Sequence, residues 1–174
     1  DGKAISYDPF TDWENGETKD LIILQGHTAN EFQYYQHIFN EDADFFNAIC
    51  STMMETQLEG SSEEFHSVFE DYKQALIDLG YPEDSIAKEY CNDRSLAIGN
   101  TYQATKHAEN GGKGYFYIFE QSYDGSMAKY GAAHAIDCYY LFGTFEGNEA
   151  AGTKEEVDLS RRFQRMIANF CSPG

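Results

Sequence analysis

Basic residues are scarce in this chain. It has 12 Lys and Arg against 30 Asp and Glu, which gives a formal net charge of −18 at pH 7. Nucleic acid and anionic membranes are themselves negative, so both are excluded as expected partners. The acidic residues are spread along the chain rather than gathered in a tail, which indicates a solvated acidic surface.

Long apolar runs are also lacking. No stretch approaches the ~18 consecutive apolar residues that a membrane-spanning helix needs, and the first residues do not form a signal peptide. Because Asp1 does not look like a natural N-terminus, the cellular location stays open, with the cytoplasm slightly favoured over secretion.

Cysteine is sparse, with four residues and no Cys-x-x-Cys. This spacing does not predict a zinc site, and a chain of this length does not need a disulfide scaffold. We expect buried free thiols and leave one structural disulfide open. The cysteines are Cys50, Cys91, Cys138 and Cys171. The five histidines form no His-Glu-x-x-His motif, and we expect neither a metal nor a cofactor.

Aromatic residues, in contrast, are abundant, with 13 Tyr and 13 Phe among 174 residues. This length and composition suit one globular domain with a sizeable core, so we treat residues 1–174 as a single segment. Two short segments, residues 20–25 and 114–120, are apolar on both faces, which is typical of strands inside a parallel sheet covered by helices. Two strands cannot hide both edges of a sheet, so we expect further strands upstream.

Helices account for most of the remaining chain. The apolar spacing predicts five or six of them, at about 31–39, 43–58, 61–79, 82–90, 93–109 and 154–170. Ser61 and Glu64 form a plausible capping box for the third helix, whose inward face includes Val68 and Leu79. Residues 1–19 are polar and rich in turns, with Asp8-Pro9 and Asn15-Gly16 as helix breakers. The predicted fold class is α/β, with a mostly helical body.

Two loops after the strands hold a carboxylate and an imidazole. Glu31 follows the first strand, and His134 follows the second in a Gly-Ala-Ala turn, with Asp137 three residues later. Serine hydrolysis needs a nucleophile, a histidine that accepts its proton, and a carboxylate that orients the imidazolium. In α/β-hydrolases these residues occur in the order Ser, acid, His, each after a strand. The chain therefore contains the acid and the base in the required order.

These segments resemble the type B carboxylesterases, the family of cholinesterases and para-nitrobenzyl esterases. The family's Asp-Glu-Gly turn resembles Asn30-Glu31-Phe32, although Asn30 replaces the usual acid and Phe32 the usual glycine. Further similar segments preserve the family's order over nearly the whole chain. They are Asp1-Gly2-Lys3 with Asp8-Pro9, Tyr115 to Phe119, and Leu159-Ser160-Arg161-Arg162 with Asn169-Phe170.

The resemblance implies a C-terminal part of an α/β-hydrolase in which Glu31 is the catalytic acid and His134 the general base. It also implies that Asp137 is a buried acid supporting the histidine from one turn away. A salt bridge from Asp137 to an arginine is the alternative. The aromatic residues of segment 32–39, together with Tyr139, Tyr140 and Phe142, are candidates for lining the substrate pocket, on composition only, and four of them are singled out. They are Phe32, Tyr35, Tyr139 and Phe142.

The nucleophile is missing from the 174 residues. There is no Gly-x-Ser-x-Gly, and no His-Gly-Gly or Gly-Gly-Gly segment for an oxyanion hole. We therefore expect the N-terminal part of the same protein to supply the serine, with a small-molecule ester as substrate. The chain alone should be inactive, because those groups carry the covalent chemistry and most of the charge stabilisation.

Two other interpretations remain open. The chain could be a non-catalytic, esterase-like module that binds proteins, or a self-contained acidic helical interaction domain. If the chain is part of an esterase-like protein, whether catalytic or not, its two bare strands should expose edges that can pair with other strands. We expect dimerisation or segment exchange to cover these edges.

Overall fold

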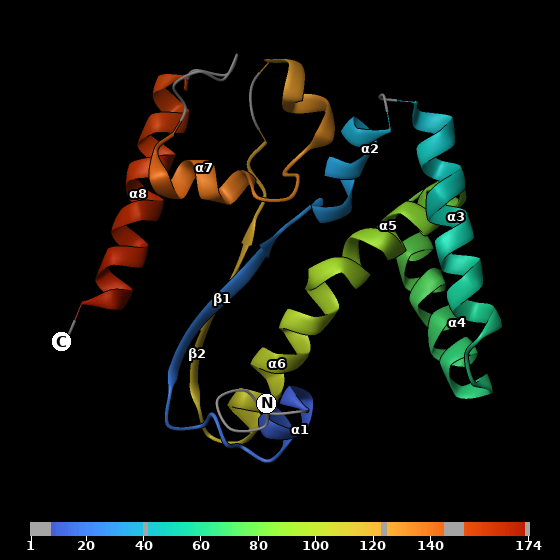
Figure 1. Ribbon diagram of the computed structural model, residues 1–174, viewed down its shortest axis with the longest axis horizontal. Helices are drawn as coiled ribbons and strands as arrows, with labels where there is room; N and C mark the ends of the chain where they lie inside the picture. Colours follow the sequence, from blue (N-terminus) through green and yellow to red (C-terminus); the bar gives the residue numbers. More distant parts are fainter. Residues whose placement is uncertain (1–7, 40–41, 123–124, 145–151, 173–174) are drawn as a thin grey trace.

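A two-stranded parallel sheet with helices around it forms the centre of the molecule in the computed structural model (Figure 1). The structure describes residues 8–39, 42–122, 125–144 and 152–172. Most of these residues are helical, as predicted. The family segment expected at residues 1–3 lies outside the described residues.

The two strands pair in register over their whole length. Strand β1 runs over Ile22–Thr28 and β2 over Lys113–Phe119, with Ile22 opposite Lys113 and Thr28 opposite Phe119. The parallel pairing was predicted, but β1 lies two residues later than expected. Gly26 lets the strands approach, because a Cβ there would lie 2.3 Å from the carbonyl oxygen of Tyr117.

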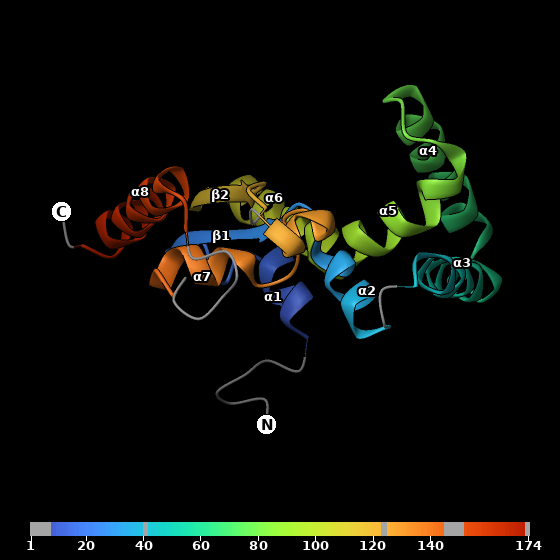
Figure 2. The same cartoon turned by 90° about the horizontal axis from the view of Figure 1, so that it is seen from above.

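Helices lie on both sides of this sheet. Helices α7 (Ile136–Phe142) and α8 (Lys154–Cys171) pack against each other on one side, and α6 (Ile98–Glu109) contacts both strands from the other (Figures 1 and 2). The core between β2, α7 and α8 consists of aromatic and aliphatic side chains. It contains Phe119, Ala132, Ile136, Tyr140 and Phe163.

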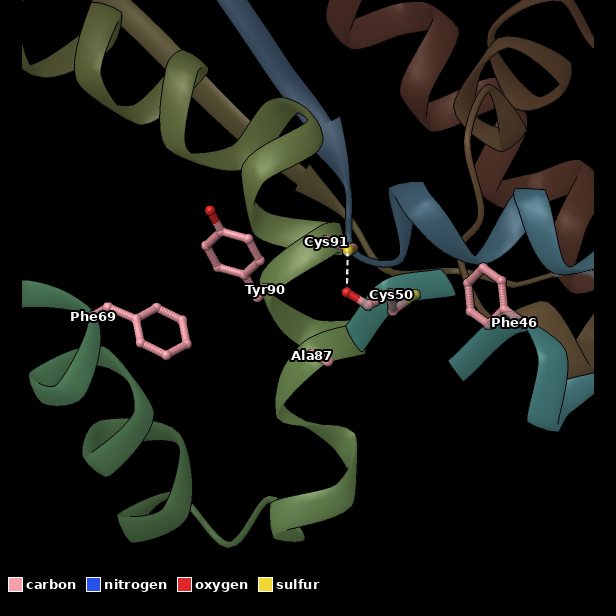
Figure 3. Packing of buried hydrophobic residues seen from close by; sticks show 6 residues of the cluster. All are labelled: Phe46, Cys50, Phe69, Ala87, Tyr90 and Cys91. Carbon is pink, nitrogen blue, oxygen red and sulfur yellow. Dashed lines mark hydrogen bonds between the residues drawn. The ribbon is translucent and has the colours of Figure 1, made fainter. Parts of the chain in front are cut away.

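A second core lies beyond the sheet. It forms where α3 (Ala43–Glu59), α4 (Glu63–Asp78) and α5 (Ile86–Asn92) meet. Figure 3 shows the thiol of Cys91 directed at the carbonyl oxygen of Cys50, 3.8 Å away, with Tyr90 facing Phe69. The other buried members are Phe46 and Ala87.

Helix α1 (Pro9–Glu14) lies in the segment that was predicted to be polar and rich in turns. The Asp8-Pro9 pair, interpreted as a breaker, is a helix start. The Asp8 carboxylate accepts a hydrogen bond from the Thr11 amide at 3.3 Å, and Pro9 takes the first helical position, where no amide is needed.

The start of α4 also differs from the prediction. Ser62, not Ser61, is the N-cap and accepts the amide of Phe65 at 3.2 Å, whereas the Ser61 hydroxyl donates back to the carbonyl of Gln57. The predicted inward face was too wide, since Val68 is 60% and Leu79 75% exposed. No other described element covers them.

Helices predicted at 82–90 and 93–109 form one continuous helical run. A short turn η2 (Glu83–Ser85) leads into α5, a π-helical segment η3 (Asp93–Ala97) and α6 without a break. No glycine or proline lies between Ile86 and Ile98 to end it. None of the helices in the described part combines the length and apolar character that a membrane crossing requires.

Candidate active site

The carboxyl ends of the two strands bring the predicted acid and base together. Beyond β1, the turn η1 (Glu31–Gln33) carries Glu31 and leads into α2 (Tyr34–Ile38). Beyond β2, the turn η4 (Gly125–Tyr130) precedes His134 and α7. Because parallel strands end at the same edge of a sheet, two loops that are 103 residues apart in sequence become neighbours.

Glu31 and His134 are in direct contact. The Nδ1 atom of His134 lies 2.6 Å from Oε2 of Glu31. The other carboxylate oxygen, Oε1, accepts the backbone amide of Thr28 at 2.7 Å. Both oxygens of the acid are therefore occupied, and the carboxylate is fixed in one orientation.

This contact determines the tautomer of His134. A carboxylate only accepts hydrogen bonds, so Nδ1 carries the shared proton and Nε2 of the neutral ring keeps its lone pair. The side chain of Glu31 is 4% exposed, whereas that of His134 is 51% exposed. The arrangement thus has a buried acid and an accessible base, with Nε2 unpartnered among the described residues.

The backbone after His134 is strained. Ala135 has φ +65°, the left-handed region that non-glycine residues rarely adopt, and it directly precedes helix α7. Strained positions of this kind cluster at active sites, ligand clamps and switch regions, where the surrounding structure holds them in place.

Asp137 is placed differently from the prediction. It is half-buried rather than buried, and its Oδ2 accepts the hydroxyl of Tyr117 at 3.0 Å. None of the ion pairs between described residues joins it to an arginine. Burial first, and then the Asp137 carboxylate, raise the pKa of the Tyr117 hydroxyl, so that this donor stays protonated.

The predicted pocket residues separate into two groups. Phe32 is half-buried and stacks on Phe46, with ring centroids 5.8 Å apart, so it supports the acid turn from the second core. Tyr35 is 41% exposed beside it. Tyr139 and Phe142 are exposed on α7, at 42% and 70%.

Tyr34, one of the aromatic residues of the predicted pocket segment 32–39, lies beside the imidazole. Its ring centroid lies 6.4 Å from that of His134, and the side chain is 39% exposed.

Two of the other histidines, His107 and His27, make contacts away from this pair. His107 is 2% exposed, and its ring joins Thr18 to the carbonyl of Lys113 through contacts of 3.2 and 3.1 Å. The buried His27 contacts the carbonyl of Thr28 at 2.9 Å. Within the described residues, no group of three or more His, Cys, Asp and Glu is arranged to hold a metal ion.

The cysteines are all free. Cys50 and Cys91 are buried, as expected, but Cys138 and Cys171 are exposed, because they lie on the outer faces of α7 and α8.

An open apolar groove of about 370 Å³ lies between the sheet and α8, lined by side chains that include Ile22, Tyr115 and Phe170. These strand residues are near the amino ends of β1 and β2, so the groove is at the opposite end of the sheet from His134.

Comparison with curated proteins gave no match. The model of the carboxylesterase family matches residues 1–174, and with the predicted acid and base in contact at the strand ends, the chain belongs to the carboxylesterase family.

Proposed function

We propose that this chain supplies the acid and the base of a Ser–His–Glu triad that hydrolyses carboxylic esters. The observation that carries the proposal is the 2.6 Å contact between His134 Nδ1 and the buried carboxylate of Glu31. Membership of the carboxylesterase family supports ester hydrolysis at the family level. The roles of the individual residues are our inference from geometry and chemistry.

In the proposed reaction, a serine hydroxyl attacks the carbonyl carbon of the ester. Nε2 of His134 accepts the hydroxyl proton as the bond forms, and Glu31 stabilises the resulting imidazolium through Nδ1. The tetrahedral intermediate then collapses, and His134 returns the proton to the departing alcohol. Water, activated by the same nitrogen, releases the carboxylic acid from the acyl-serine.

The serine must come from outside these residues. The 174 residues contain no Gly-x-Ser-x-Gly, and no His-Gly-Gly or Gly-Gly-Gly segment for an oxyanion hole. Half exposure of His134 supports a partner segment approaching from its Nε2 side. We therefore propose that the chain by itself does not turn over esters, and that an N-terminal part of the same protein completes the site.

Aromatic side chains around the pair are the proposed contacts for the ester. Tyr34, at the start of α2, adjoins the imidazole, Tyr35 lies next to Tyr34, and Tyr139 and Phe142 lie on the helix after His134. Phe32 is the weakest candidate because it packs into the second core. Replacing Tyr34 or Tyr35 by Ala should change the ratio of kcat/KM between short and bulky esters, whereas Phe32→Ala should mainly lower stability.

The test uses the longer protein encoded at the native locus and a para-nitrophenyl ester. We expect His134→Ala to lower kcat by about 10⁴-fold and Glu31→Gln to lower it strongly, without loss of folding. Unchanged kcat in His134→Ala would refute the triad. If the longer protein has no serine at the expected position and no activity, the esterase-like binding module becomes the better interpretation.

A further inference from the structure

We infer that Asn30 is a positioning residue, which sets the distance between Glu31 and His134 by tying the turn of the acid to the turn of the base. Asn30 immediately precedes Glu31 and makes two hydrogen bonds to Ala132, two residues before His134. The consequence for catalysis rests on the proposed function. The positioning itself rests on these contacts.

Both polar groups of the backbone of Ala132 are bound by one residue. The backbone amide of Asn30 donates to the carbonyl of Ala132 at 3.0 Å, and the side-chain Oδ1 of Asn30 accepts the amide of Ala132, also at 3.0 Å. Asn30 and Ala133 also form an isolated parallel bridge. Ala132 is fully buried, so water cannot replace either bond without opening the core.

Gly131 makes room for this side chain. It has φ +64°, and a Cβ at this position would lie 2.2 Å from Oδ1 of Asn30. The amide of Asn30 therefore fits against the base turn only because a glycine lies opposite. The two loops are complementary at this point, independently of the contact between Glu31 and His134.

The link is short enough to control the catalytic pair. Asn30 is the direct neighbour of Glu31 in the chain, and a single residue separates Ala132 from His134. A displacement of one turn against the other would pass almost undiminished to the 2.6 Å contact. A misplacement of about 1 Å at a reacting group can cost about 100-fold in rate.

The experiment detects the Nδ1 proton of His134 by ¹H NMR in the 174-residue chain. A proton shared with a carboxylate gives a downfield signal, which His134→Ala assigns by its disappearance. We expect the signal to persist in the wild type and in Asn30→Asp, which keeps the acceptor for Ala132. It should vanish or move upfield in Asn30→Ala, and persist in Asn47→Ala, a matched change at an exposed site on α3.

A second variant approaches the contact from the other loop. Gly131→Ala should displace the Asn30 side chain and give the same spectral loss. If circular dichroism shows that Asn30→Ala does not fold, Asn30→Ser is used in its place. The serine side chain is too short for its hydroxyl to reach the amide of Ala132. An unchanged signal in Asn30→Ala or Asn30→Ser would overturn the proposal, as would the absence of any downfield signal in the wild type.

Kinetics of the longer protein separate positioning from general stability. Asn30→Ala should lower kcat by about 10- to 100-fold with KM unchanged, and Asn30→Asp should recover most of it. An equal loss of kcat in Asn30→Ala and Asn30→Asp would contradict the role of the side-chain oxygen as acceptor for the amide of Ala132. If the longer protein hydrolyses no ester while the signals behave as expected, the proposed function fails and the positioning role stands.

Discussion

The side-chain oxygen of Asn92 accepts the backbone amide of Phe32 at 2.9 Å, across 60 positions of sequence. Asn92 is 2% exposed at the end of α5, and Phe32 directly follows Glu31. The acid turn is therefore held from two sides, by Asn92 from the second core and by the base turn through Asn30.

Replacing Asn92 should destabilise the fold. Asn92→Ala leaves a half-buried amide of Phe32 without its acceptor, which costs about 1–3 kcal/mol. Urea denaturation followed by circular dichroism measures the change in free energy of unfolding. Asn92→Asp keeps the acceptor and should lose less, and the exposed Asn47→Ala should lose little. Equal stability of Asn92→Ala and the wild type would show that this hydrogen bond is not needed.

The pair Glu31 and His134 illustrates what sequence can predict. Both lie in loops directly after apolar strands, in the chain order of a known triad, so local pattern was enough to choose them. The structure brings them into contact, while their catalytic roles remain predictions. The resemblance to carboxylesterases is confirmed by the family match.

Asn30 and Asn92 illustrate what it cannot predict. Their side chains bind backbone groups 102 and 60 positions away, and nothing in the local sequence specifies such a partner. The prediction that Val68 faces inward was wrong for a related reason. Apolar spacing predicts a face that could be buried, but burial depends on whether another element lies against it.

Alkaline pH should weaken the fold through Tyr72. Its hydroxyl donates to Asp93 at 2.9 Å, and burial, reinforced by that carboxylate, raises its pKa above the ordinary value of 10.0. The folded state therefore keeps a proton that the unfolded state releases. Stability from this group is complete below about pH 10 and is lost as the pH rises further.

Thermal melts between pH 8 and pH 11 provide the measurement. Tyr72→Phe removes the titrating hydroxyl, so its melting temperature should fall less steeply above pH 10 than that of the wild type. Part of the fall in melting temperature should remain in Tyr72→Phe, because the pKa of Tyr117 is also raised. Identical slopes in both proteins would rule out Tyr72 as a source of the alkaline loss.

Thiol reactivity should distinguish Cys138 from the buried cysteines. Desolvation by neighbouring protein atoms, and then the carboxylate of Asp137, raise the pKa of the exposed Cys138 thiol, so little thiolate is present at neutral pH. In a Cys171→Ala background, Cys138 should be the one thiol that iodoacetamide modifies in the native chain, because Cys50 and Cys91 are buried.

Asp137→Asn removes the repulsive charge and should speed this modification several-fold at pH 8, with the two rates converging as the pH rises. Mass spectrometry at timed intervals follows the adduct. A rate that does not respond to Asp137→Asn would mean that burial alone controls the thiol.

The exposed sheet should drive self-association of the isolated chain. Ile22, Tyr115 and Ile118 are 61%, 62% and 53% exposed, and each strand has an unpaired edge among the described residues. Open strand edges with apolar side chains favour pairing with another chain. We therefore expect the mass from light scattering to rise above that of one 19.8 kDa chain at tens of micromolar.

Ile118→Lys places a charge on β2 and should shift the equilibrium toward monomer, whereas Val68→Lys, an equally exposed change on α4, should not. A monomer at all concentrations would show that the sheet is protected in solution, and an equal effect of both lysines would trace the association to net charge rather than to the strands.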